Sequence, residues 1–162
     1  MSKMEYMPVD CLQVPKMLFQ VEEFKNLSNT AKILYSLFLD RLKFAVQNGW
    51  VDHNGDLFVI YPKSEMKKDL NTTRYGVDQA VQELVKIGKL VRIVQNDGKA
   101  NHFYINDIYE KLKEIADTGL TMLIVEQDVN RSLKSSDYAY VVLEGKIVMQ
   151  GCLLYTSDAA DD

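Results

Sequence analysis

The chain has 162 residues, of which 47% are hydrophobic and 26% are charged, and its formal net charge is -4. This length fits one or two small domains, and the apolar content is sufficient to bury a core, which argues against a disordered chain. Since no apolar stretch reaches about 18 residues and the N-terminus lacks an apolar signal core, we expect a cytoplasmic protein that makes no membrane contact.

The charge is unevenly distributed along the chain. Residues 1–106 hold 14 basic and 12 acidic side chains, whereas residues 107–162 hold 5 and 11. Such asymmetry indicates two segments of different origin. Because nucleic-acid binding follows local charge, the acidic total does not exclude DNA binding by the first segment. The few cysteines and histidines match no metal-binding spacing, so we expect no metal and no cofactor.

The first predicted elements are an extended arm and a long helix. Residues 6–24 mix apolar positions with prolines such as Pro15, which predicts an extended arm with at most a short strand or turn. Ser28 then predicts the N-cap of an amphipathic helix, because apolar residues follow it at spacings of three and four. Asn48-Gly49 predicts the end of that helix.

A hairpin and a short helix are predicted next. Two β-type runs, residues 50–51 and 57–61, flank Asn54-Gly55, which is typical of a tight hairpin turn. The following run from Ser64 to Leu70 predicts a short helix, and residues 71–73 interrupt it.

A second, longer helix is predicted from Thr73 to Ile87. Thr72 or Thr73 provides its N-cap, and Gly88 is placed to stop it. One face of this helix is apolar, formed by Val77, Ala80, Val81, Leu84 and Ile87. Two helices joined by a three-residue turn predict a helix-turn-helix.

Two β-like runs complete this segment. Leu90–Val94 and His102–Ile105 flank a polar, glycine-containing tip and predict a hairpin directly after the second helix. A hairpin in that place is the wing of a winged-helix domain. The sequence therefore predicts a winged-helix domain over residues 1–106.

The polar face of the helix Thr73–Ile87 is suited to a DNA major groove, which accepts one α-helix. Arginine pairs well with guanine and glutamine with adenine, while threonines and a helix N-terminus suit phosphate. The predicted DNA-contacting residues are Thr72, Thr73, Arg74, Tyr75, Gln79, Gln82, Lys86, Arg92 and Lys99. The competing interpretation is a merely solvated face, and Asp78 and Glu83 count mildly against DNA.

The run from Tyr6 to about Ile105, most distinctively the block from Ala31 to Asp52, resembles the N-terminal domain of plasmid replication initiator protein A. The resemblance implies a winged helix that binds double-stranded DNA at repeated sites of a plasmid origin and starts plasmid replication. A homodimer and host replication proteins are candidate partners. Full-length members of that family are longer than this chain. A transcriptional regulator with the same fold is the alternative.

The second segment, residues 107–151, has a different pattern. Ile108–Ile115 predicts an amphipathic helix ended by Gly119, and Thr121–Val125 predicts a buried parallel strand. A further helix to about Lys134 is followed by strands Tyr138–Leu143 and Lys146–Met149. The predicted fold class is therefore α+β: a winged helix-turn-helix domain followed by a small, incomplete α/β fragment.

Residues 108–151 resemble the C-terminal part of the ATP-binding subunit of a branched-chain amino acid ABC transporter. The resemblance places Gln127 at the switch position near the γ-phosphate. The chain contains no GxxxxGK[ST] phosphate loop, so we expect no ATP hydrolysis and no enzyme activity. Residues 152–162 fit neither resemblance and predict a disordered tail or translated sequencing-adaptor sequence.

Overall fold

The computed structural model describes residues 11–95, 100–121, 123–125, 133 and 136–152. Contacts divide the chain into two units, Met1–Asn106 and Asp107–Asp162. Helices and strands occur in both units, which confirms the predicted α+β class. Among the described helices, none combines the length and apolar character that a bilayer crossing requires.

Two short helices replace the predicted extended arm from residue 17 onward, where the prediction was wrong, whereas residues 11–15 form no helix or strand. These are α1 (Met17–Gln20) and α2 (Glu22–Lys25). Pro15 precedes the first turn and its carbonyl accepts the N–H of Leu18 at 3.2 Å. Leu18 and Phe24 are almost completely buried, so tertiary burial favours a helical path that local proline chemistry does not reveal.

The long helix is α3 (Asn29–Asn48), and both of its predicted ends are confirmed. The Ser28 hydroxyl accepts the N–H of Ala31 at 3.1 Å, and Gly49 ends the helix with a left-handed φ of 63°. The inward-facing residues of α3 include Ala31, Leu34, Tyr35, Phe38 and Ala45. This face supports both the helix-turn-helix and the sheet, since α3 packs against α5 and β1.

The hairpin predicted around Asn54-Gly55 forms only in part. Val51 and Leu57 make a single isolated bridge, and Gly55 turns the chain with a φ of 88°. The strand that follows, β1 (Val59–Ile60), pairs with β3 (His102–Ile105) in antiparallel register. The partner of β1 therefore comes from more than 40 residues later in the chain, and local turn chemistry carries no information about it.

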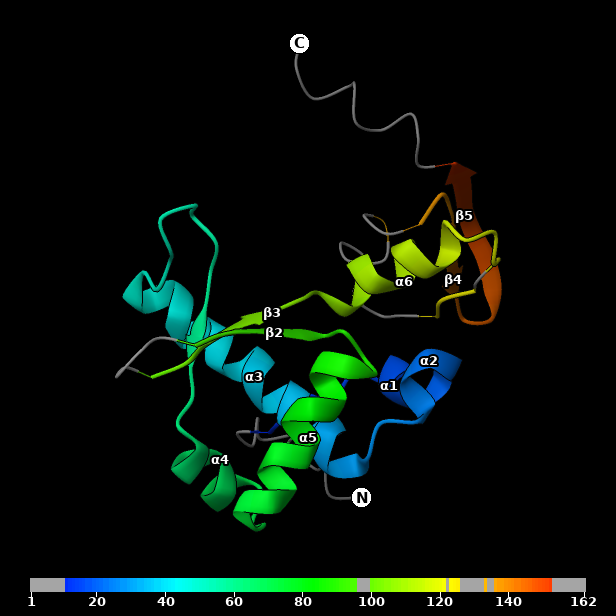
Figure 1. Ribbon diagram of the computed structural model, residues 1–162. Coiled ribbons are helices and arrows are strands. Elements are labelled where there is room, and N and C mark those ends of the chain that lie inside the picture. The colour runs from blue at the N-terminus through cyan, green and yellow to red at the C-terminus, as the bar shows by residue number, and fades with distance from the viewer. Residues whose placement is uncertain (1–10, 96–99, 122, 126–132, 134–135, 153–162) are drawn as a thin grey trace, which may run out of the picture. The chain divides into compact units, whose positions relative to one another are not determined.

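The predicted helix-turn-helix is confirmed in α4 (Lys63–Asp69) and α5 (Arg74–Lys86), which lie next to each other in Figure 1. Asn71 makes the tight turn possible with a φ of 45°, a conformation that asparagine tolerates better than most residues. Val77, Ala80 and Leu84 of α5 are buried, as predicted. Ile87 is 45% exposed, so its predicted place on the apolar face was wrong, because the helix ends before it.

The stop signal after α5 differs from the prediction by one residue. Gly88 is not the left-handed residue; Lys89 is, with a φ of 49°. Gly88 is instead buried, and a Cβ added to it would lie 3.2 Å from the Leu90 side chain. Gly88 therefore allows close packing against Leu90. The left-handed conformation is adopted by Lys89, whose Cβ makes that conformation sterically unfavourable.

Replacing Lys89 by glycine should raise the free energy of unfolding by about 0.5–1 kcal/mol, because glycine adopts positive φ without steric strain. Urea denaturation followed by fluorescence of the single tryptophan measures the change. Lys86→Gly is the matched control. Lys86 lies within the helix, so this variant should have a free energy of unfolding about 1 kcal/mol lower than the wild type. A destabilised Lys89→Gly variant would contradict the strain argument.

The wing is confirmed as β2 (Val91–Val94) and β3, which pair antiparallel. The strand order is β1-β3-β2, so β3 is the central strand. Strands β2 and β3 are seen side by side in Figure 1. The sheet packs its inner face on α3 through Phe103, whose ring centroid lies 5.0 Å from that of Phe38. This core fixes α5 and the wing on one scaffold.

The second unit contains α6 (Ile108–Ala116) and an antiparallel hairpin of β4 (Tyr138–Leu143) and β5 (Lys146–Cys152). The helix and both strands were predicted, with β5 three residues longer than expected. Asp107 caps α6 by accepting the N–H of Tyr109 at 2.9 Å. Glu144 and Gly145 form the hairpin turn with positive φ values of 49° and 77°.

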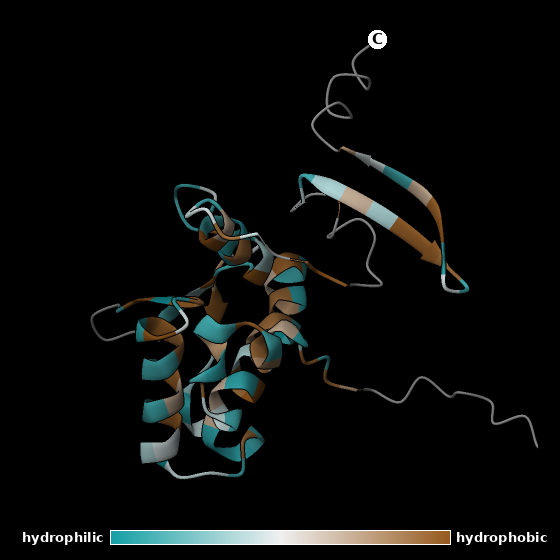
Figure 2. Ribbon diagram, turned by 90° about the vertical axis from the view of Figure 1, so that its right-hand side faces the viewer, coloured by the Kyte–Doolittle hydropathy of each residue, from teal (hydrophilic) through white to brown (hydrophobic). Residues whose placement is uncertain are grey.

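The buried parallel strand predicted at residues 121–125 was wrong. The described residues of this run form no strand, and Leu123 and Val125 are 87% and 86% exposed. An apolar run becomes a buried strand only when neighbouring strands and helices cover it. The β4–β5 hairpin is likewise exposed, and Figure 2 shows hydrophobic residues in both strands near its turn. Gln127 and most of the helix predicted up to Lys134 lie outside the described residues.

Candidate nucleic-acid interface

The outward surface of α5 is polar and open to solvent. We define the outer face of α5 as Arg74, Tyr75, Gln79, Gln82 and Lys86. Tyr75 is 72% exposed, Arg74, Gln82 and Lys86 are also exposed, and Gln79 is half-buried. Because residues three and four apart share one side of a helix, Tyr75, Gln79, Gln82 and Lys86 form a continuous stripe opposite the buried apolar face, and Arg74 lies beside this stripe in the first turn.

The N-terminus of α5 is fixed by two threonines with different roles. The Thr73 hydroxyl accepts the N–H of Gly76 at 3.1 Å and is the N-cap, which settles the choice that the sequence left open. Thr72 lies against Gly76, where an added Cβ would come within 2.4 Å of the Thr72 Oγ1 atom. Gly76 therefore allows the close approach of the turn to the first turn of the helix.

The two acidic residues that counted against a DNA-binding helix both have partners within the fold. The Asp78 carboxylate lies 2.6 Å from the Lys63 ammonium of α4. The Glu83 carboxylate accepts the backbone N–H of Ser28 at 2.7 Å, at the N-terminus of α3. A negative charge is favourable at that helix end. Both carboxylates therefore hold α5 in place, and sequence reasoning missed this role because the partners are remote in the chain.

The wing residue Arg92 is engaged on the outer side of the sheet. Its guanidinium lies over the ring of its cross-strand partner Tyr104, at 3.8 Å from the centroid, and 3.9 Å from the Asp56 carboxylate. Its side chain remains 55% exposed. Lys99, the other predicted wing contact, lies outside the described residues.

The loop beside Arg92 is ordered by Asp52. Its carboxylate accepts the N–H groups of Asn54 and Asp56 at 2.8 and 3.0 Å and the Tyr104 hydroxyl at 2.9 Å. Partial burial raises the pKa of Asp52, but these hydrogen bonds lower it by more, so the net shift is downward. Burial and the Asp52 carboxylate together raise the pKa of Tyr104. The carboxylate therefore stays ionised and the phenol protonated near neutral pH.

Two exposed lysines in the last turn of α4, Lys67 and Lys68, were not among the predicted contacts. Their carbonyls accept the N–H groups of Thr72 and Asn71, each at 3.1 Å, so both lysines lie close to the turn that leads to α5. The signal that could have identified them is their position four to six residues before Thr72 and Thr73, two of the predicted phosphate contacts.

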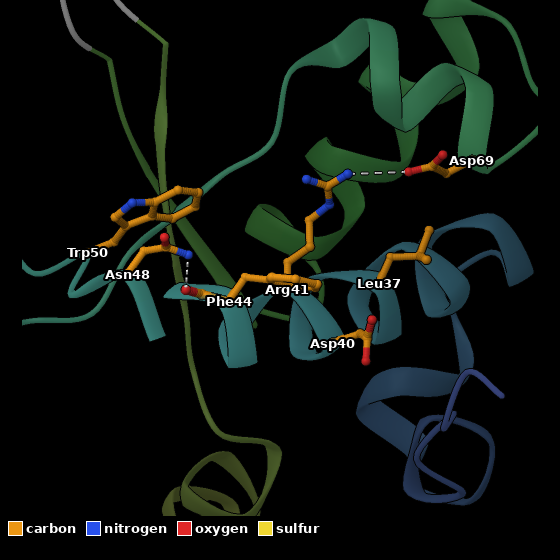
Figure 3. Close-up of a pocket in the computed structure, with 7 residues that line it drawn as sticks. All are labelled: Leu37, Asp40, Arg41, Phe44, Asn48, Trp50 and Asp69. Atoms are coloured by element: carbon orange, nitrogen blue, oxygen red, sulfur yellow. Dashed lines mark hydrogen bonds and ion pairs between the residues drawn. The ribbon is translucent and has the colours of Figure 1, made fainter. Parts of the chain in front are cut away.

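A surface hollow of about 370 Å³ lies over α3 and is shown in Figure 3. Leu37, Asp40, Arg41, Phe44, Asn48, Trp50 and Asp69 line it. Arg41 is the cationic residue that lines this hollow, and it is already ion-paired. Its guanidinium lies 2.7 Å from the Glu65 carboxylate and 3.5 Å from the Asp69 carboxylate. Burial, together with the hydrogen bond to Asp69, raises the pKa of the neighbouring Tyr61. The hollow thus offers no free charged group to an anion.

The described residues contain no group of three or more histidine, cysteine, aspartate or glutamate side chains placed to hold a metal ion. The thiols of Cys11 and Cys152 are exposed and unpaired by disulfides. The surface with the clearest binding chemistry in the described part of the chain is therefore the outer face of α5 with its flanking basic residues.

Residues 10–118 match the family model described as the N-terminus of replication initiator protein A (RepA). The chain belongs to this family. The match covers the helix-turn-helix and the wing and continues through α6, beyond the boundary between the two units. The resemblance stated for Tyr6 to about Ile105 is thereby confirmed over the matched residues.

Two solved structures have the same fold as this RepA N-terminal domain. One is entitled "Structure of Rep-DNA complex", with 28% identity and a TM-score of 0.54, covering 70% of this chain and 91% of that one. The other is entitled "N-Terminal domain of DNA binding protein", with 30% identity and a TM-score of 0.53, covering 66% and 87%. The similarity therefore includes nearly the whole of each of those domains.

Two curated proteins each match a part of this chain. A 41 kDa protein of Lactobacillus helveticus is 26% identical over 96 residues, or 59% of this chain and 27% of that protein. The high-affinity branched-chain amino acid transport ATP-binding protein BraG of Pseudomonas aeruginosa is 38% identical over 60 residues, or 36% and 26%. The chain thus spans about a quarter of the length of each curated relative.

Proposed function

We propose that this chain binds double-stranded DNA in a sequence-specific manner and acts at a plasmid replication origin. The observation that carries the proposal is the division of α5. Its inner residues Val77, Ala80 and Leu84 are buried on the scaffold, while its outer face stands free in a helix-turn-helix. Membership of the replication initiator family supports origin DNA as the ligand.

In this proposal the outer face of α5 reads base edges in the major groove. Arg74 is suited to guanine, and Gln79 and Gln82 to adenine. Lys67 and Lys68 of α4 and Lys86 of α5 are exposed cations that suit the phosphates on either side. Arg92 and Lys99 add phosphate contacts from the wing.

The acidic side chains of α5 do not oppose this assignment. Asp78 is ion-paired with Lys63, and Glu83 accepts a hydrogen bond from the Ser28 N–H. Their charges are therefore partly compensated within the domain. Repulsion of phosphate by these two carboxylates is correspondingly reduced.

Selection of duplexes from a random library by the full chain, followed by fluorescence anisotropy, tests this proposal. Arg74→Ala should weaken binding to the selected duplex about tenfold and affect a scrambled duplex much less, because a base contact is lost. Lys67→Ala should weaken binding to both duplexes. It should also reduce the slope of log affinity against log salt concentration by about 1, because one phosphate contact is lost.

Lys43→Ala is the control for loss of one exposed lysine, since Lys43 lies on α3 next to Asp40 and outside the proposed surface. Enrichment of no sequence, or equal loss in all three variants, would contradict sequence-specific reading by α5. Placement of the selected sequence at a promoter instead of an origin would favour a transcriptional role.

A further inference from the structure

The loop that joins Trp50 to β1 carries two carboxylates close to the wing. We define the acidic loop as residues 52–56, with Asp52 and Asp56 as its acidic members. Asp52 binds the Tyr104 hydroxyl, and Asp56 lies 3.9 Å from the Arg92 guanidinium, which itself lies over the Tyr104 ring. The four side chains thus connect the acidic loop to the outer side of the wing.

The position of Asp56 is determined by the loop. Its backbone N–H donates to the Asp52 carboxylate at 3.0 Å, and its carbonyl accepts the Asp52 N–H at 2.9 Å. Gly55, with a φ of 88°, turns the chain between them. The Asp56 carboxylate is therefore held near Arg92 by backbone geometry, although 61% of its side chain is exposed.

A carboxylate and a phosphate are alternative partners for the same guanidinium, because both present anionic oxygens to its fork of N–H donors. We propose that Asp56 competes with DNA phosphate for Arg92 and thereby lowers the affinity of the wing for DNA. This inference rests on the proposed function. It adds that Asp56 is an affinity-determining residue of that DNA-binding surface.

The ring of Tyr104 explains why Arg92 remains available to phosphate when it leaves Asp56. The ring contacts the face of the guanidinium, whereas Asp56 lies near one terminal nitrogen, so the guanidinium keeps a contact on the wing without Asp56. An exposed ion pair is weak, so DNA phosphate can displace the carboxylate. The expected cost to DNA affinity is therefore modest and measurable.

The test uses the full chain and a fluorescein-labelled 20-base-pair duplex of random sequence, because a phosphate contact needs no particular sequence. Asp56→Asn should bind this duplex about two- to fivefold more tightly than the wild type at low salt. Its plot of log affinity against log salt should be steeper by up to about 0.9, the contribution of one added phosphate contact. Asp56→Ser should change both quantities in the same direction.

Two further variants separate this mechanism from a general effect of charge. Glu22→Gln removes one exposed negative charge on α2, beside Lys25, and should leave the affinity unchanged. In an Arg92→Ala background, Asp56→Asn should give no gain. The proposal is overturned if Asp56→Asn binds no more tightly than the wild type, if Glu22→Gln gains as much, or if the gain persists without Arg92.

Failure of this proposal is distinguishable from failure of the proposed function. A wild-type chain that binds no duplex at low salt contradicts DNA binding itself and this proposal with it. A wild-type chain that binds, with no difference in Asp56→Asn, contradicts only the competition between Asp56 and phosphate. Circular dichroism melting of each variant confirms that the compared proteins are folded.

Discussion

Replacing Phe38 by alanine should lower the free energy of unfolding of the first unit by about 3–5 kcal/mol. Phe38 is completely buried in α3, and its ring centroid lies 5.6 Å from that of Tyr61 and 5.0 Å from that of Phe103. The substitution removes this aromatic contact between the helix and the sheet and leaves a cavity in its place. Urea denaturation followed by the fluorescence of Trp50, the single tryptophan, measures the loss.

Phe44→Ala is the matched control for this prediction. Phe44 belongs to the same helix and is the same residue type, but 56% of it is exposed. Its replacement should cost less than about 1 kcal/mol, because little apolar surface leaves water when it folds. Equal denaturation midpoints for the two variants would show that Phe38 does not hold α3 to the sheet.

Replacing Glu83 by alanine should lower the free energy of unfolding by about 2 kcal/mol, because it removes a charged acceptor from a backbone N–H. The N–H of Ser28 would then lack the partner that it has at 2.7 Å in the folded chain. The variant also loses a favourable charge at the N-terminus of α3. The same tryptophan-monitored denaturation measures the effect.

Glu83→Gln keeps an oxygen acceptor and should recover part of the loss, which a mere change in helix propensity would not produce. Glu22→Ala is the second comparison, since Glu22 is 80% exposed and contacts only its neighbour Lys25 among the ion pairs of the described residues. Its cost should stay below about 1 kcal/mol. A Glu83→Ala variant as stable as Glu22→Ala would contradict a tie between α5 and α3.

Features determined by local chemistry were predictable from the sequence. The Ser28 cap, a threonine cap at the start of α5, the Gly49 end of α3 and the division of α5 into two faces all depend on residues within one or two turns. Those signals predicted the order of the elements, in which a long helix is followed by the two helices of the helix-turn-helix and then by the wing. The same locality explains why most of the outer face of α5 could be named before its exposure was known.

Features determined by remote contacts were not predictable. Glu83 and Ser28 are 55 residues apart, so the sequence showed an acid on the helix predicted to contact DNA without showing the partner of that acid. The helices α1 and α2 depend on burial of Leu18 and Phe24, which outweighs the extended preference around Pro15. The apolar run at residues 121–125 has the composition of a core strand but lacks covering elements among the described residues.

The separation of roles on α5 has a consequence for how such a domain acquires a new target. Burial, the Thr73 cap and the ties through Asp78 and Glu83 all involve positions other than Tyr75, Gln79, Gln82 and Lys86. Tyr75, Gln82 and Lys86 are exposed and therefore open to exchange with little effect on folding, whereas Gln79 is half-buried. Under the proposed function, a library varied only at these exposed positions should yield variants that select new duplex sequences at near-native stability, and one scaffold would then serve plasmids with diverging origins.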